Sequence, residues 1–187
     1  MGLSVVYAAD TGHVVGALAL TGALGPAVAG PAAAPPDPAA FVGRALPLRV
    51  SLDNGEVAAL PLGVRELAAA AVDDEPAALA EPLAFGVELS PDGRPKPALV
   101  RLASWTGGIS LAADGLVVKV QVASGRPVRV TALVSDDEDT HVLAGEIPAG
   151  QLEVKLPLTL APGRENGHGV LVLAAGWAGR LQKVKLT

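Results

Sequence analysis

The sequence contains no cysteine, so it can form no disulfide bond, no thiolate metal site and no cysteine nucleophile. Aromatic residues are also scarce and make up 3% of the 187 residues. Proteins that stack nucleic-acid bases or sugars on their side chains need more rings than this. We therefore expect no nucleic-acid partner. Because the lack of disulfides is compatible with a reducing compartment, we expect a cytoplasmic protein.

Positive charge is missing from the start of the chain, where no lysine or arginine precedes Arg44. A secretory signal peptide begins with positive charge, so this start does not predict one. Residues 14–36 are uncharged and long enough to cross a bilayer, but eight glycines and prolines interrupt them. We therefore expect neither a targeting signal nor a membrane span.

Alternation of apolar and polar residues is the strongest signal that the chain does carry. In residues 151–160, every second position is aliphatic: Leu152, Val154, Leu156, Leu158 and Leu160. A β-strand sends alternate side chains to opposite faces, so this segment predicts a half-buried strand. The same alternation recurs in residues 46–52, 116–122 and 128–134. The pattern predicts an all-β fold, specifically an antiparallel β-sandwich.

The sandwich is expected over residues 83–187, where short strands follow one another at a spacing of about ten to twelve residues. The turns between them carry Asp, Ser and Gly, for example at residues 114–115 and 124–125. Residues 169–175 are apolar on both parities. A strand of this kind is covered on both faces, so we expect it at the centre of a sheet.

The first 82 residues are expected to form two smaller units. Residues 1–40 predict an N-terminal arm, made of a β-hairpin over residues 4–20 and an Ala/Gly/Pro linker over residues 22–40. Such an arm can exchange strands with a neighbouring copy or fold back onto its own sheet. Residues 41–82 predict a second hairpin and one short helix over 64–71, which could continue to residue 80; this unit can also belong to the main domain.

Prolines indicate which strands lie at sheet edges. Pro47, Pro61 and Pro157 each stand in a Leu-Pro-Leu triplet within a predicted strand. Proline cannot donate a hydrogen bond to a neighbouring strand, so these strands are expected at edges or bulges.

No recognisable catalytic or metal-binding pattern is present. The three histidines, His13, His141 and His168, have no metal-ligand spacing, and Asp73, Asp74 and Glu75 lack the pattern of a calcium loop. His13 and His141 each follow an Asp-Thr pair, which would suit equivalent hairpin turns or, if they converged with acids in a cleft, an Asp/His catalytic site. We expect no enzyme activity, no metal and no cofactor.

Three features are candidates for contacts with protein partners. The acidic run at a predicted hairpin tip is either a solvated surface or a site for a basic partner. The two tryptophans with small neighbours either fill the core or anchor an interface. The first hairpin could dock through its apolar face. The candidate residues are Asp136, Asp137, Glu138, Asp139, Trp105, Trp177, Val14 and Leu18.

The charge of the chain is unevenly distributed. Residues 1–93 carry a net charge of −8, with three basic and eleven acidic residues, whereas residues 94–187 carry +3. The difference is either a chance distribution over the surface or a basis for head-to-tail attraction between copies, which would close into rings or grow into filaments.

These observations favour a non-enzymatic structural or adaptor subunit of a larger protein assembly, such as a phage-tail-like or injection-machine component or a shell subunit. Its partners would be proteins, in a homo-oligomer or a larger complex. The alternative is a β-sandwich module that binds a carbohydrate or another ligand, which surface rings near the tryptophans would support. A hydrolase or lyase is a third hypothesis and requires the histidines to meet carboxylates in a cleft.

Overall fold

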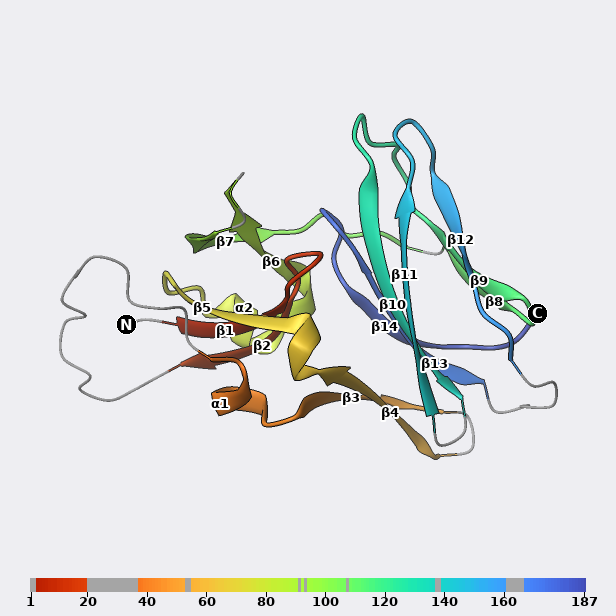
Figure 1. Cartoon of the computed structure of the whole chain (residues 1–187), viewed down its shortest axis with the longest axis horizontal. Coiled ribbons are helices and arrows are strands. Elements are labelled where there is room, and N and C mark those ends of the chain that lie inside the picture. Colours follow the sequence, from red (N-terminus) through yellow and green to blue (C-terminus); the bar gives the residue numbers. More distant parts are fainter. Residues whose placement is uncertain are drawn as a thin grey trace.

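The computed structural model describes residues 3–19, 37–52, 55–90, 92, 94–106, 108–136, 139–160 and 167–187 (Figure 1). Within these residues the chain forms fourteen β-strands, two one-turn α-helices, α1 (Ala39–Val42) and α2 (Ala77–Ala80), and two 3-10 turns, η1 (Val64–Glu66) and η2 (Pro82–Ala84). The predicted all-β class is confirmed.

Two antiparallel sheets form the predicted sandwich. One has the order β11 (Asp139–Ile147), β10 (Val128–Asp136), β13 (His168–Ala174) and β14 (Arg180–Val184). The other has the order β12 (Glu153–Pro157), β9 (Gly115–Lys119) and β8 (Ile109–Ala112). Alternate residues of β10 pack against β9 and β12 in the first hydrophobic core, as the alternation predicts.

Strand β13 is buried along its whole length, because both faces of its sheet are covered. Val170, Val172 and Ala174 point into the first core. Leu171 and Leu173 point the other way, into a second core behind the sheet. The prediction of a central, doubly covered strand in this region is confirmed.

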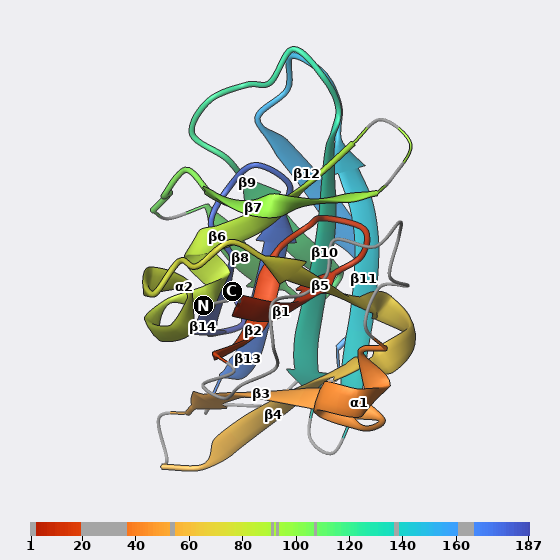
Figure 2. The ribbon, with the colours of Figure 1, turned by 90° about the vertical axis from the view of Figure 1, so that its left-hand side faces the viewer.

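The second core is closed by two elements from the N-terminal half. One is a two-stranded ribbon of β3 (Ala45–Ser51) and β4 (Val57–Gly63). The other is a three-stranded sheet with the order β2 (Val14–Ala19), β1 (Leu3–Ala8) and β5 (Leu67–Val72). Figure 2 views the molecule from the side of this sheet, with the sandwich behind it. Both predicted hairpins are therefore present, while the turn at residues 53 and 54 lies outside the described residues.

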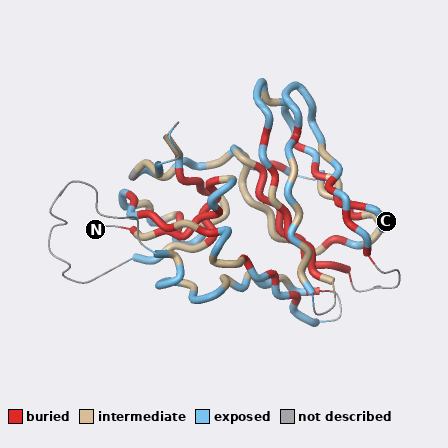
Figure 3. The backbone as a smooth tube through the Cα atoms, in the orientation of Figure 1, coloured by how far each residue is buried: buried red, intermediate tan, exposed pale blue. Residues whose placement is uncertain are grey.

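A third core lies on the far side of the N-terminal sheet. Alternate residues of β1 and β5 enter it, and Phe85 and Val87 of β6 (Phe85–Leu89) cover it. β6 pairs with β7 (Pro95–Arg101), and β7 contacts β5. A single β-bridge also joins Gly86 of β6 to His13, the residue before β2. The buried residues thus lie mainly in three cores, while exposed residues concentrate at loop tips and outer faces (Figure 3).

The N-terminal hairpin folds back onto its own chain. β1 lies between β2 and β5, and all six of its residues pair with β5, from Leu3 opposite Val72 to Ala8 opposite Leu67. The sequence left open whether this hairpin folds back or exchanges between copies. Most of the predicted linker lies outside the described residues, and the domain boundaries at residues 40 and 82 stay a prediction.

The helix predicted over residues 64–71 is wrong beyond its first turn. Only Val64–Glu66 is helical, and the Ala-rich segment that follows is strand β5. Alanine favours a helix in isolation, but this preference is weak and tertiary context overrides it. Here Leu67 and Ala69 enter the second core while Ala70 and Val72 enter the third, and only a strand can serve two cores in this way.

Strand ends also differ from the alternation in the sequence. β9 ends at Lys119 and β12 begins at Glu153, so Val122 and Leu152 lie beyond the sheet and are 64% and 38% exposed. The prolines behave as predicted. Pro47 faces Pro61 in the two-stranded ribbon, and Pro157 lies on the edge strand β12.

We expect Leu171→Ala to lower the free energy of unfolding by about 2–5 kcal/mol, because it leaves a cavity in the second core where the side chain is fully buried. Leu79→Ala is the control, since Leu79 is 44% exposed and its loss should cost no more than about 0.5 kcal/mol. Urea denaturation measures both. Equal, small effects would show that the second core contributes little to stability.

Candidate functional site

His13 joins the N-terminal sheet to the sandwich. It lies at the start of β2 with no exposed surface. Its Nε2 donates to the carbonyl of Trp177 at 2.7 Å, and its Nδ1 accepts from the Thr11 hydroxyl at 2.9 Å. Because a carbonyl can only accept, the first bond assigns the proton to Nε2. Burial lowers the pKa of His13 from 6.5 to about 4, so the ring is neutral at neutral pH.

The turn between β1 and β2 contacts β6 at Gly12, the residue before His13. Gly12 has φ of 77°, a conformation that side-chain-bearing residues rarely adopt. A Cβ at this position would lie 2.9 Å from the carbonyl oxygen of Val87, whose N–H donates to the carbonyl of Gly12. The close approach of this turn to β6 therefore requires glycine.

The two tryptophans lie at the same junction. Trp105 is 5% exposed, donates through Nε1 to the carbonyl of Ala178 at 2.8 Å and lies 5.2 Å beneath the Arg180 guanidinium. Trp177 is half-buried against the first core and its backbone pairs with Ala103. Both side chains contact the interior of this molecule, so the core-packing interpretation accounts for their position, and they form no exposed aromatic platform.

The remaining histidines lie elsewhere. His141 Nε2 is 3.5 Å from Asp136 Oδ2 at the β10–β11 hairpin, where Asp136 faces Asp139. Asp137 and Glu138 lie outside the described residues. His168 is fully buried, and its Nδ1 donates to the carbonyl of Ser135 at 2.7 Å while its Nε2 has no partner.

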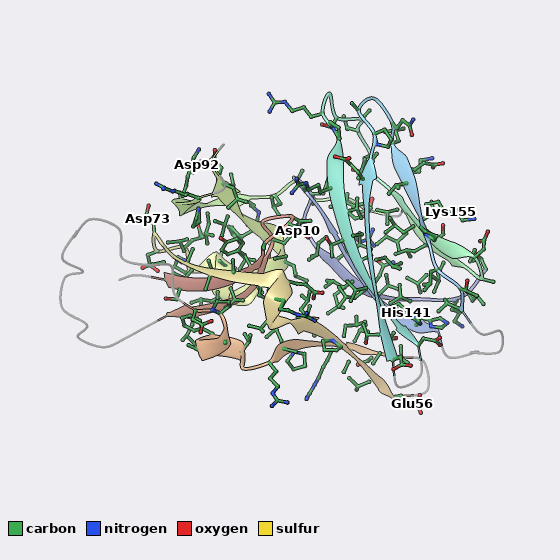
Figure 4. The ribbon with its side chains drawn as sticks, in the orientation of Figure 1. Asp10, Glu56, Asp73, Asp92, His141 and Lys155 are labelled. Atoms are coloured by element: carbon green, nitrogen blue, oxygen red, sulfur yellow. The ribbon has the colours of Figure 1, made fainter. Side chains whose placement is uncertain are left out.

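The structure does not bring His13 and His141 together. The turn of His13, marked by Asp10, and His141 lie at different places along the sandwich sheet (Figure 4). Among the described residues no three His, Asp or Glu side chains are grouped to hold a metal ion. In the same part of the chain, no helix has the length and apolar character needed to cross a membrane.

One open cleft of about 380 Å³ lies between the β1–β2 turn and the outer face of β10 and β11. Asp10 forms one wall, and Arg129 and Glu146 project from neighbouring strands, where they are cross-strand partners. Such a site can bind a polar ligand through opposite charges. Sequence reasoning missed it because its lining comes from three segments that only the fold brings together. Its full lining is Asp10, Arg129, Val130, Thr131, Ala144, Gly145 and Glu146.

Strand β11 forms the border of this cleft and an open edge of the sandwich sheet. It is nine residues long and pairs with β10 alone; its other edge makes no backbone-to-backbone hydrogen bond within the described chain, although β12 packs beside it and the Thr140 hydroxyl donates to the carbonyl of Ala59 at 3.4 Å. Val142 is 48% exposed. Among the edge strands of the described chain, β3, β4, β7 and β12 contain proline, whereas β11 contains none, as is also true of β2, β5, β6, β8 and β14; β11 is the longest edge strand. The sequence shows the missing proline, but only the strand order shows that β11 is an edge.

The residues predicted at the first hairpin divide between core and surface. Val14 is fully buried in the third core, whereas Leu18 is 48% exposed. Both positions have the same parity in β2, so alternation alone predicts the same burial for both. Leu18 is exposed because the end of β2 extends beyond the residues that pack against the sheet.

No protein-family model, curated protein or solved structure matches this chain. The fold defines the chain as a layered all-β protein.

We expect the free energy of unfolding to decrease as the pH is lowered from about 7.5 to about 5, because of His13. The pKa of its ring is about 4 in the fold and 6.5 when unfolded, so the unfolded chain binds more protons between these values. The contribution of His13 is complete above pH 6.5 and is lost as the pH falls towards 4. We expect a loss of about 2 kcal/mol between the two pH values, measured by urea denaturation.

His13→Gln removes the titrating group while keeping a donor and an acceptor, so this variant should lose much less stability over the same pH range. An unchanged pH dependence in His13→Gln would contradict the assignment.

Proposed function

We propose that this chain is a non-enzymatic structural or adaptor subunit of a larger protein assembly. The open edge of β11 is the observation that carries the proposal. An unpaired edge presents a row of N–H and C=O groups that can pair with a strand of another chain. Each such hydrogen bond contributes about 0.5–1.5 kcal/mol net, so several in a row give a stable contact.

The contrast with the other edges supports this role. Proline in β3, β4, β7 and β12 removes backbone donors and prevents uncontrolled pairing. β11 lacks proline, as do β2, β5, β6, β8 and β14, but at nine residues it is longer than every other edge strand of the described chain. Val142 and Ala144 are exposed on its outer face, beside the cleft, where they can contact alternate side chains of an added strand.

A rigid framework also suits a subunit that must hold several contacts in fixed positions. At the junction between the layers, His13 donates to the carbonyl of Trp177 and the Gly179 N–H donates to the carbonyl of Leu83. Satisfied hydrogen bonds in an apolar surrounding restrict the arrangement of the groups that they join.

The second candidate is a module that binds a small polar ligand in the cleft of about 380 Å³. Its volume lies within the usual range for ligand sites, and Asp10, Arg129 and Glu146 offer both signs of charge. Because the cleft borders β11, ligand binding and strand addition would use adjoining surfaces.

Substitution on β11 tests the proposed function. We expect the full chain to form multimers in sedimentation velocity, with slower amide exchange in residues 139–147 as the concentration rises. Val142→Lys should weaken association at least about tenfold, since an edge lysine opposes strand addition. Val122→Lys is the matched control, because Val122 is an exposed valine on a loop. A chain that stays monomeric at all concentrations would contradict the proposal.

A further inference from the structure

The geometry points to a specific head-to-tail contact between copies of this chain. The outer face of the β3–β4 ribbon of one copy binds the acidic corner between β5 and α2 of the next. We call these surfaces the arginine ribbon (Arg44, Arg49, Arg65 and the exposed residues of β3 and β4) and the acidic corner (Asp73, Asp74, Glu75 and Leu79). This inference rests on the proposed assembly function and names its partner as a second copy.

The arginine ribbon is a sheet face that nothing in the described chain covers. Its inner residues, such as Leu60 and Leu62, close the second core. Its outer residues are exposed and pair across the two strands, Pro47 with Pro61, Arg49 with Ala59 and Ser51 with Val57. The outer face is therefore apolar and carries Arg49 between its paired residues.

Two more arginines extend this positive surface. Arg44 precedes β3, and its carbonyl accepts from Val64, the neighbour of Arg65 in η1. All three arginines are exposed, and none forms an ion pair with a described carboxylate. They are the three basic residues of the otherwise acidic first half. All three therefore lie on or directly beside the ribbon, where they can attract carboxylates.

The acidic corner has the complementary composition. Asp73 and Asp74 are exposed after the end of β5, and no described cation pairs with them. Glu75 is half-buried and its Oε1 accepts from the N–H of Ala77 at 3.3 Å. Leu79 of α2 is 44% exposed nearby. The acidic corner thus offers carboxylates beside an exposed leucine, and the arginine ribbon offers guanidinium groups beside exposed valine and proline, so the two surfaces are complementary in charge.

The positions of the two surfaces favour contact between molecules. In Figure 4, Asp73 is labelled at the left of the described molecule and Glu56, at the tip of the ribbon, at its lower right. One copy therefore offers both surfaces in different directions. A contact between two unlike surfaces leaves one of each free, so it continues to a third copy and closes into a ring or extends into a filament.

Paired charge reversals test the contact directly. In the full chain, Arg44→Glu with Arg49→Glu makes the ribbon acidic, and Asp73→Lys with Asp74→Lys makes the corner basic. Each double variant alone should associate at least about tenfold more weakly, because like charges then face each other. An equimolar mixture should recover association, since the reversed ribbon fits the reversed corner and the two native surfaces fit each other.

Sedimentation velocity at several protein concentrations gives the readout, and circular dichroism with thermal melting checks that each variant folds. Arg126→Glu is the matched control, because it reverses an exposed arginine on another loop and should not change association. Raising the salt from about 0.05 M to 0.5 M should weaken the native multimers, since salt screens charges at exposed contacts.

The outcomes separate this contact from the proposed function. Multimers that persist in both reversal variants and at high salt would overturn the ribbon contact while leaving an assembly role through β11. Variants that dissociate but do not recover on mixing would also overturn it. A native chain that stays monomeric at every concentration would overturn both proposals.

Discussion

Burial of both faces of one sheet is the constraint on which the rest of the molecule depends. β13 has aliphatic residues on both parities, so neither face of its sheet can be left in water. The smaller sandwich sheet covers one face, and the β3–β4 ribbon with the N-terminal sheet covers the other. The layered architecture follows, and the N-terminal hairpin becomes part of the folded body.

Polar bonds set how these layers meet. The chain has no disulfide to fix the junction, and the bonds of His13 to the carbonyl of Trp177 and of the Gly179 N–H to the carbonyl of Leu83 cross it instead. An unsatisfied polar group in an apolar junction is costly, so alternative arrangements that break these bonds are disfavoured. This gives the outer surfaces fixed relative positions, which is what a repeating subunit requires.

The surfaces differ in how they are protected against other chains. Prolines protect four edge strands, while β11, the longest edge strand of the described chain, contains none and borders a cleft that contains both signs of charge. The arginine ribbon meets the first residues of β11, where the Thr140 hydroxyl donates to the carbonyl of Ala59, and like the acidic corner it offers charge with small apolar areas. Strand pairing and charge would therefore act through different residues, with pairing providing most of the affinity and charge fixing orientation.

The sequence by itself determined the strand content, because period-two alternation has only one regular structure that buries one parity, and it located β13 from its double apolar pattern. It did not determine residues 67–72, since alanine favours a helix locally and only pairing with β1, some sixty residues earlier, makes them a strand. Nor did it show that β11 is an edge strand or that Arg44 and Arg65 lie beside the ends of the ribbon that carries Arg49. Strand order and layer packing decided these features, because both arise from contacts between residues far apart in the chain.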